Sequence, residues 1–268
     1  MKIIIVGAGA MGCLYGAFLS EKNQVIMVDT SRTVVDRINS QGIVVKEENG
    51  EEKNYKNNIS AYISGECDEK ADVVIMFVKS TYLENALEQN KELFQEDTMV
   101  LTLQNGAGND RKIERYARKE NIIIGTSKHN AFSEAPAVVR HTGSGVTTIG
   151  SNHHADELLK KLDGMLKESS LETLVSDDIQ RIIWDKLFVN LSINAFTAIA
   201  QTPIGYMIED KYAWNFAKRL IYEAIEVAEE DGTYFDRRQV LESVKQICKR
   251  LEHGYSSMYQ DRKRKIKT

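Results

Sequence analysis

The N-terminal segment constrains the fold of this chain more than any other part. Residues 2–6 (KIIIV) form a short β-branched run typical of a buried parallel strand. GAGAMG follows at once, and apolar residues at helical spacing continue to residue 19. In such a strand–turn–helix, the first glycine permits the tight turn, the second lets a pyrophosphate approach the backbone, and the third allows close helix–strand packing. The phosphates would bind free N–H groups at the helix N-terminus. The segment therefore predicts a dinucleotide site made by Gly7, Ala8, Gly9, Ala10, Met11 and Gly12.

The end of the second predicted strand carries the residues that would select the cofactor. This strand covers residues 25–28 and ends at Asp29, which is 29 − 12 = 17 residues after Gly12. An acid at this place accepts hydrogen bonds from the adenosine ribose and favours NAD. Arg32 could instead pair with the 2′-phosphate of NADP. The sequence leaves both cofactors open.

Strands and helices continue to alternate through residue 150, which predicts a Rossmann-type, doubly wound α/β sheet. Residues 71–78, 98–103 and 122–126 predict strands, and residues 82–94 predict a crossover helix. Residues 138–141 and 145–149 predict an antiparallel hairpin that completes the sheet.

Two polar residues follow predicted strands, at the sheet edge where ligands of such folds bind. Lys79 follows the strand of residues 71–78, and Asn105 follows the strand of residues 98–103. Both are therefore candidates for contact with the cofactor. The alternatives are a solvated strand-end lysine and an ordinary Asn-Gly turn.

Helices replace strands after about residue 150, which predicts a second, all-α domain. Helices are expected over residues 155–167, 181–201, 213–231 and 238–252, with a short extended piece at 171–175. We place the domain boundary between residues 170 and 171. Residues 1–170 would bind the dinucleotide, and residues 171–268 would bind substrate, with a possible role in forming a homodimer. A cleft between two domains is the expected place for a small substrate.

The helix predicted over residues 181–201 carries a polar row on an otherwise apolar surface. Lys186, Asn190 and Asn194 recur at i, i+4 and i+8 and so share one face. From Lys186 to Asn194 is about 12 Å along the axis, the length of a small polar ligand. Buried polar groups need partners, so this row is a candidate ligand site. The alternative is a partly exposed helix whose lysine reaches water.

Composition excludes several classes of function. A formal charge of −4 gives no general attraction to nucleic acid or to an anionic membrane. The three cysteines form no C-x-x-C pair, and the five histidines have no metal-ligand spacing. The basic run at residues 262–267 is interpreted as solvated surface. We expect a cytoplasmic protein without metal, nucleic-acid or membrane partners.

Motifs spread along the chain resemble those of the ketopantoate reductase family, whose members reduce 2-dehydropantoate to pantoate with NADPH. They are GAGAMG, Lys79, QNGAG at 104–108, WDKLFVNLSINAFTAI at 184–199 and SSMYQD at 256–261. The resemblance runs from Met1 to Thr268 and implies a role for each matched residue. Lys186 would be the general acid. Asn190, Asn194 and Ser257 would bind the substrate. Asn105 and Ala131 would lie on the nicotinamide side of the cofactor, and Lys79 would lie near its ribose and phosphates.

The chain departs from the family pattern in three places. Asp29 resembles the NAD-dependent, mandelate-type D-2-hydroxyacid dehydrogenases rather than the NADPH-dependent members, which carry an arginine nearby. Ile204 stands where some members have a substrate-binding asparagine. Family members continue with T-E-I-D and a further helix, whereas this sequence ends at Thr268, one position before that acid. We expect either a longer native chain or a protein without this carboxylate, and lowered stability in the second case. A dehydrogenase of that NAD-dependent branch and a non-catalytic nucleotide-binding protein remain alternative hypotheses.

Overall fold

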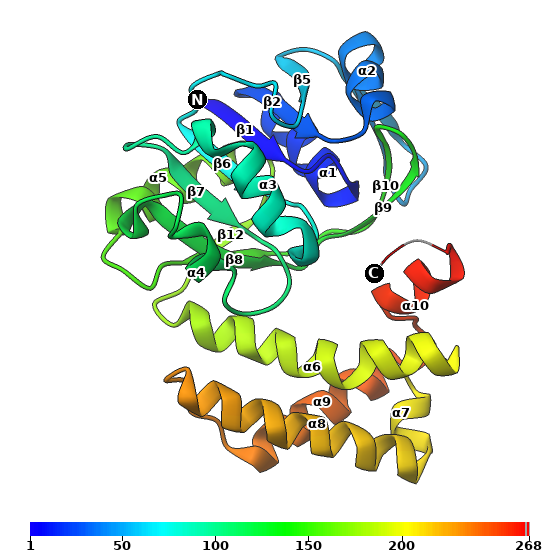
Figure 1. Cartoon of the computed structure of the whole chain (residues 1–268). Coiled ribbons are helices and arrows are strands. Elements are labelled where there is room, and N and C mark those ends of the chain that lie inside the picture. The colour runs from blue at the N-terminus through cyan, green and yellow to red at the C-terminus, as the bar shows by residue number, and fades with distance from the viewer. Residues whose placement is uncertain (266, 268) are drawn as a thin grey trace. The chain divides into compact units, whose positions relative to one another are not determined.

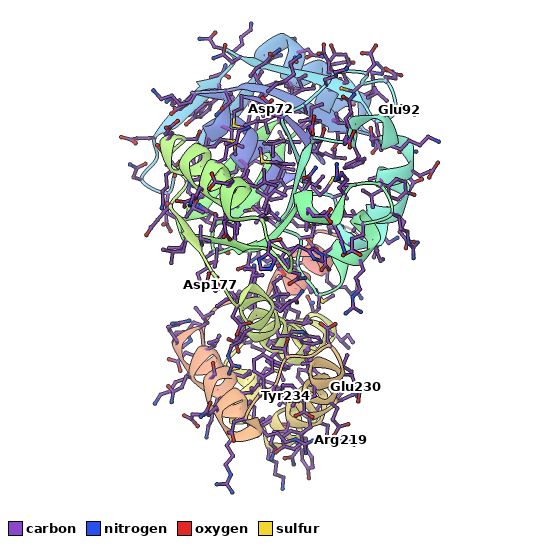
Figure 2. All side chains as sticks on the ribbon, turned by 90° about the vertical axis from the view of Figure 1, so that its left-hand side faces the viewer. Asp72, Glu92, Asp177, Arg219, Glu230 and Tyr234 are labelled. Carbon is purple, nitrogen blue, oxygen red and sulfur yellow. The ribbon has the colours of Figure 1, made fainter. Side chains whose placement is uncertain are left out.

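The computed structural model describes residues 1–265 and 267 (Figure 1). Ile266, in the basic run, and Thr268 lie outside the described residues. The chain divides into two compact units, Met1–Ile179 and Gln180–Thr268. Figure 2 shows the side chains of both, with Asp72 and Glu92 labelled in the first and Arg219 and Glu230 in the second.

Within the described residues, the first unit contains an eight-stranded sheet in the order β12-β11-β8-β7-β6-β1-β2-β5. Neighbouring strands from β5 to β8 are parallel, and β11 pairs antiparallel to β8. Chain order reverses between β1 and β6, and ligands of this fold usually bind at the carboxyl ends of the two strands that flank such a reversal. The strands are β1 (Lys2–Val6), β2 (Gln24–Asp29), β5 (Ile59–Ile63), β6 (Val73–Met76), β7 (Met99–Thr102), β8 (Ile122–Ser127), β11 (Thr147–Gly150) and β12 (Thr173–Val175).

Apolar strands explain why this sheet lies at the centre of the unit. Ile3, Ile4 and Ile5 of β1 have no exposed surface, and β6 is buried throughout. Leu14 and Leu19 of α1 pack in the same core. The helices of the unit are α1 (Ala10–Ser20), α2 (Arg32–Gln41), α3 (Leu83–Gln89), α4 (Asn109–Ile113) and α5 (Asp156–Glu168), with 3-10 turns η1 (Ser80–Tyr82), η2 (Lys91–Leu93) and η3 (Lys119–Asn121).

The crossover helix predicted over residues 82–94 is shorter than expected, because Asn90 ends α3. Its backbone leaves the helical region at φ −120° and ψ 26°. The buried side chain donates to the Ala86 carbonyl and the Ser64 hydroxyl and accepts from Gly65 N at 3.0 Å. Hydrogen bonds to another part of the chain thus stop the helix and fix the loop after β5.

The hairpin predicted from residues 138–141 and 145–149 is wrong. Residues 138–143 form β10 in a separate four-stranded sheet of order β4-β3-β10-β9, whereas β11 pairs with β8 in the large sheet. The hairpin partner of β10 is β9, across a turn in which Ala137 has a φ of 54°. The strands of this sheet are β3 (Ile43–Lys46), β4 (Glu52–Tyr55), β9 (Asn130–Ala135) and β10 (Val138–Gly143). Of these four, the sequence pattern predicts only β10.

The second unit is helical, as predicted. In Figure 1, α6 lies alongside α8 and α9. Phe188 is buried against Phe235 with ring centroids 4.8 Å apart, and Trp184 Nε1 donates to Asp231 Oδ2 at 3.2 Å. The helices are α6 (Ile179–Ala200), α7 (Tyr206–Glu209), α8 (Lys211–Glu230), α9 (Arg237–Arg250) and α10 (Ser257–Lys263).

In the described part of the chain, α6 meets the length and composition expected of a membrane span. Its most apolar 18-residue window has a mean hydropathy of 1.2, and 39% of that window is buried. The core helix of a protein that never enters a membrane passes the same test. The ring contact of Phe188 with Phe235 and the hydrogen bond from Trp184 to Asp231 are contacts typical of a core helix.

The first unit ends at Ile179, nine residues after the boundary placed at residue 170 (179 − 170 = 9). The reason is β12, which pairs parallel with β11 through Thr147↔Thr173 to Ile149↔Val175 and so extends the large sheet. Asp177, labelled in Figure 2, belongs to the short segment between β12 and α6.

Candidate functional site

The turn between β1 and α1 has the geometry of a dinucleotide-binding loop. Gly7 has a φ of +107°, and an added Cβ would lie 2.7 Å from Val78 N. At Gly12 an added Cβ would lie 1.8 Å from the Gly7 carbonyl oxygen. At Gly9 nothing lies within 4 Å of that position, and α1 begins next to it without a side-chain cap. Open space at the uncapped start of a helix fits a pyrophosphate, whose oxygens would accept from backbone N–H groups.

Asp29 is bonded to the glycine turn itself. Ala8 N donates to Asp29 Oδ2 at 2.7 Å, and Ser31 N donates to Oδ1 at 2.9 Å. Each carboxylate oxygen retains a second lone pair for another donor. The carboxylate thus stands directly beside the turn, where ribose hydroxyls of a dinucleotide could reach it.

The loops after β6 and β7 lie side by side at the same sheet edge. Gln104 Nε2 donates to the Val78 carbonyl at 2.6 Å, and Ser80 Oγ donates to the Asn105 carbonyl at 3.1 Å. The structure therefore brings the loops that carry Lys79 and Asn105 together. Gln104, which makes one of these bonds, was not among the candidates.

Ala131 lies in β9 opposite His141 of β10. It is half-buried and follows β8, the next parallel strand along the same edge. The candidates in the first unit therefore come from the ends of β1, β2, β6, β7 and β8.

The polar row of the second unit lies on α6 as the helical spacing predicts. Lys186, Asn190 and Asn194 are all half-buried. One turn farther on, Thr197 is fully buried and its hydroxyl lies 2.7 Å from the hydroxyl of Ser256. This contact holds the start of α10 against α6.

The serine motif divides into two environments. Ser256 is buried and caps α10 by accepting from Tyr259 N at 3.2 Å. Ser257, the candidate substrate residue, is the first residue of α10 and is exposed. Ile204 is buried, and its N–H donates to the Gly254 carbonyl at 2.9 Å, so this position packs the helical unit.

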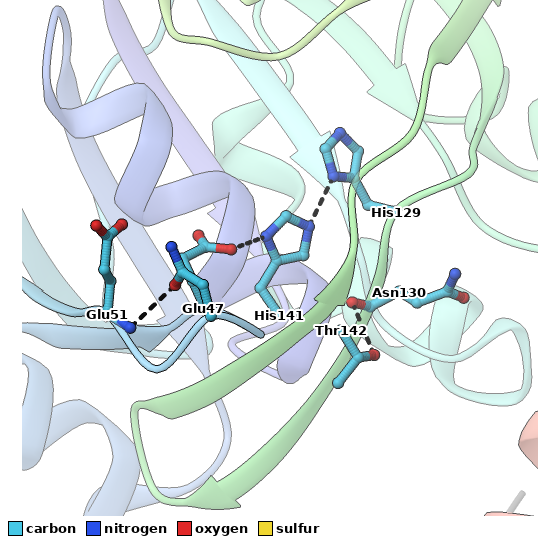
Figure 3. A network of polar contacts seen from close by, with 7 residues as sticks. Glu47, Glu51, His129, Asn130, His141 and Thr142 are labelled. Atoms are coloured by element: carbon cyan, nitrogen blue, oxygen red, sulfur yellow. Dashed lines mark hydrogen bonds and ion pairs between the residues drawn. The ribbon is translucent and has the colours of Figure 1, made fainter.

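A buried histidine pair, not predicted from the sequence, consists of His129 after β8 and His141 in β10 (Figure 3). His129 Nδ1 lies 3.0 Å from His141 Nε2, and His141 Nδ1 lies 2.8 Å from Glu47 Oε2. In the His141 tautomer that donates from Nδ1 to Glu47, Nε2 accepts a hydrogen bond from His129 Nδ1. Among the described residues, nothing bonds His129 Nε2, which is buried. Burial, and then the neighbouring His141, lower the pKa of His129 from 6.5 to about 4.

We expect His129 to contribute to the free energy of unfolding in a way that depends on pH. Between pH 6.5 and about 4 the unfolded chain binds a proton at residue 129 that the folded protein excludes. The contribution is therefore complete above pH 6.5 and is lost as the pH falls toward 4. The free energy of unfolding, measured by urea titration, should fall by about 1 kcal/mol more between about pH 7 and pH 5 in the wild type than in His129→Gln. Equal falls in the two proteins would contradict this account.

Potential metal ligands and thiols were located among the described residues. No group of three or more His, Cys, Asp or Glu side chains is placed to hold a metal ion there. The thiols of Cys13 and Cys248 are buried, and burial raises their pKa values to about 12 and about 11. Neither thiol would be an effective nucleophile at neutral pH.

Both units match families of known proteins. Residues 3–154 match the family described as ketopantoate reductase PanE/ApbA, and residues 178–268 match the ketopantoate reductase PanE/ApbA C terminal. The chain is 32% identical over 265 residues to the 2-dehydropantoate 2-reductase of Lactococcus lactis subsp. lactis, covering 97% of this chain and 85% of that protein. It is 30% identical over 263 residues to the 2-dehydropantoate 2-reductase of Halobacterium salinarum, covering 97% and 86%.

A solved structure of the same architecture has a different named activity. The ternary structure of D-mandelate dehydrogenase with NADH and anilino(oxo)acetate superposes with a TM-score of 0.89 at 30% identity. The match covers 97% of this chain and 85% of that one.

Proposed function

The chain belongs to the ketopantoate reductase family, and from that premise we propose that it reduces 2-dehydropantoate to (R)-pantoate with NAD(P)H, in pantothenate and coenzyme A biosynthesis. The family makes it an oxidoreductase with a Rossmann-type fold. The observation that carries the proposal is the polar row of α6, because Lys186, Asn190 and Asn194 share one face of a helix inside the matched C-terminal region.

The cofactor residues of the first unit support the same proposal. When bound, the nicotinamide supplies the hydride. Residues 7–12 would hold its pyrophosphate at the start of α1, and Asp29 would accept from its adenosine ribose. Lys79, Asn105 and Ala131 would line the remaining edge toward the nicotinamide.

Lys186 would act on the substrate carbonyl. Negative charge develops on the carbonyl oxygen as its carbon is reduced, and a fixed ammonium stabilises that charge and then donates the proton. Asn190 and Asn194 would donate to the hydroxyl and the carboxylate end of the substrate, and Ser257 to the carboxylate. Amide donors at successive turns of one helix suit a short, polar, extended acid.

A second candidate function is an NAD-linked D-2-hydroxyacid dehydrogenase. The observation that favours it is Asp29, which lies beside the glycine turn and would repel a 2′-phosphate. The similarity to D-mandelate dehydrogenase, solved with NADH, supports this alternative.

A substrate panel separates these functions. We expect steady-state kinetics to give the highest kcat/KM with 2-dehydropantoate among branched and aromatic 2-oxo acids, each assayed with NADH and NADPH. A preference for an aromatic 2-oxo acid with NADH would instead establish the second function. Binding of NADH without turnover of any 2-oxo acid would establish a non-catalytic nucleotide-binding protein.

A further inference from the structure

The loops after β2 and β5 lie side by side at the sheet edge that would receive the adenosine. Asp29 pairs with Ile63 across the two strands, and Ser64 N donates to the Asp29 carbonyl at 3.0 Å. A residue shortly after β5 is therefore close to the residues shortly after β2.

Glu66, which follows β5, forms an ion pair with Arg32, which follows β2. The distance from Arg32 Nη2 to Glu66 Oε1 is 3.3 Å, and the two side chains are 63% and 57% exposed. Arg32 is the first residue of α2, three positions after Asp29. The guanidinium that could receive a 2′-phosphate is thus paired with a carboxylate from the loop after β5.

Buried contacts fix the backbone that presents Glu66. Asn90, which is 3% exposed, accepts from Gly65 N at 3.0 Å and donates to Ser64 Oγ at 2.8 Å. Glu66 N itself donates to the Ile63 carbonyl at 2.9 Å. The backbone of Glu66 is consequently fixed close to Arg32, although the carboxylate itself is exposed to solvent.

We propose that Glu66 is a specificity-determining residue that selects NAD over NADP. It acts in two ways: it occupies a donor of Arg32, and it adds a negative charge next to the place of the 2′-phosphate. A phosphate monoester carries close to two negative charges at neutral pH and binds best to an arginine whose donors are available. The 2′-hydroxyl of NAD needs no such arginine and can donate to Asp29. The inference rests on the proposed function only in that the chain binds a nicotinamide dinucleotide.

The test measures binding rather than turnover. Calorimetry on Glu66→Gln at one ionic strength would give Kd values for NADH and NADPH, and for the fragments ADP and 2′,5′-ADP. The Kd of NADPH and of 2′,5′-ADP should fall roughly three- to tenfold, the size expected for charges in solvent. The Kd of NADH and of ADP should stay within about twofold.

Two further variants show whether the effect belongs to Glu66. Glu69→Gln removes the same charge from the same segment, but Glu69 pairs with Lys2 at 2.8 Å and should leave all four Kd values unchanged. In an Arg32→Ala background, Glu66→Gln should give a smaller gain, because the arginine that it releases is absent.

The outcomes distinguish the inference from the proposed function. Tight NADH binding with an unchanged Kd for NADPH in Glu66→Gln overturns the inference alone. An equal gain in Glu69→Gln also overturns it, since the effect would then come from net charge. A wild-type chain that binds neither NADH nor ADP overturns both the inference and the proposed function.

Discussion

Replacing Lys186 with alanine should lower kcat by about several hundred-fold or more, with a much smaller change in KM. Alanine removes both the positive charge that stabilises the developing oxyanion and the proton that neutralises it. Such an interaction is stronger in the transition state than in the ground state, so its loss appears mainly in kcat. Steady-state assays with 2-dehydropantoate would measure the effect.

Two controls make the result specific to Lys186. Lys186→Arg keeps a positive charge but holds its proton too tightly to donate it, so it should recover little of the lost rate. Lys211→Ala removes a lysine whose ammonium lies over the Tyr212 ring at 5.0 Å, and it should react at close to the wild-type rate. A near-normal kcat in Lys186→Ala, with NADH binding intact, would rule out the assigned role.

The second large effect concerns the glycine turn. Gly12→Ala should destabilise the protein by about 3 kcal/mol and abolish NADH binding, because overpacking against fixed backbone forces the turn apart. The added methyl group would lie 1.8 Å from the Gly7 carbonyl oxygen, and neither atom belongs to a flexible side chain. Thermal unfolding and NADH titration would measure the two consequences.

Gly9→Ala is the matched control at the same turn. The backbone of Gly9 has a φ of −72°, which alanine adopts freely, and an added Cβ meets open space. We therefore expect wild-type thermal stability together with NADH binding weakened by about tenfold or more, since the methyl group would stand where the pyrophosphate approaches. A Gly12→Ala protein that melts like the wild type, or a Gly9→Ala protein with unchanged NADH affinity, would refute this interpretation of the turn.

The parts of the fold predictable from sequence depend on local patterns. The first strand and its glycine turn are specified by adjacent residues, and the turn geometry at Gly7 and Gly12 agrees with the prediction. The periodicity of α6 likewise places Lys186, Asn190 and Asn194 on one face. The functions of these residues remain predictions, which the variants above test.

The parts that could not be predicted depend on distant pairing. The strand of residues 130–135, NAFSEA, has little apolar character and is defined by its partner β10. Asn90 ends a helix through bonds to Ser64 and Gly65, about 25 residues earlier in the chain. Besides the strand predicted at residues 138–141, the run Ile43–Val44–Val45, followed by Asn49–Gly50, is a local sign of the small sheet. The sequence does not predict that Glu66 lies beside Arg32, or that the histidine pair lies beside Glu47, because both contacts depend on the order of the strands.

The small sheet also determines the order in which the chain can acquire its structure on the ribosome. Strand β3 ends at Lys46, but its parallel neighbour β10 begins at Val138, which is 138 − 46 = 92 residues later. At ordinary translation speeds this interval lasts roughly 5 to 20 s. Throughout it, one edge of β3 lacks its native neighbour, and an unpaired apolar edge is a site of wrong association. The nascent chain can therefore aggregate through β3 during synthesis, whereas in the folded protein β3 is paired on both edges, with β4 and β10.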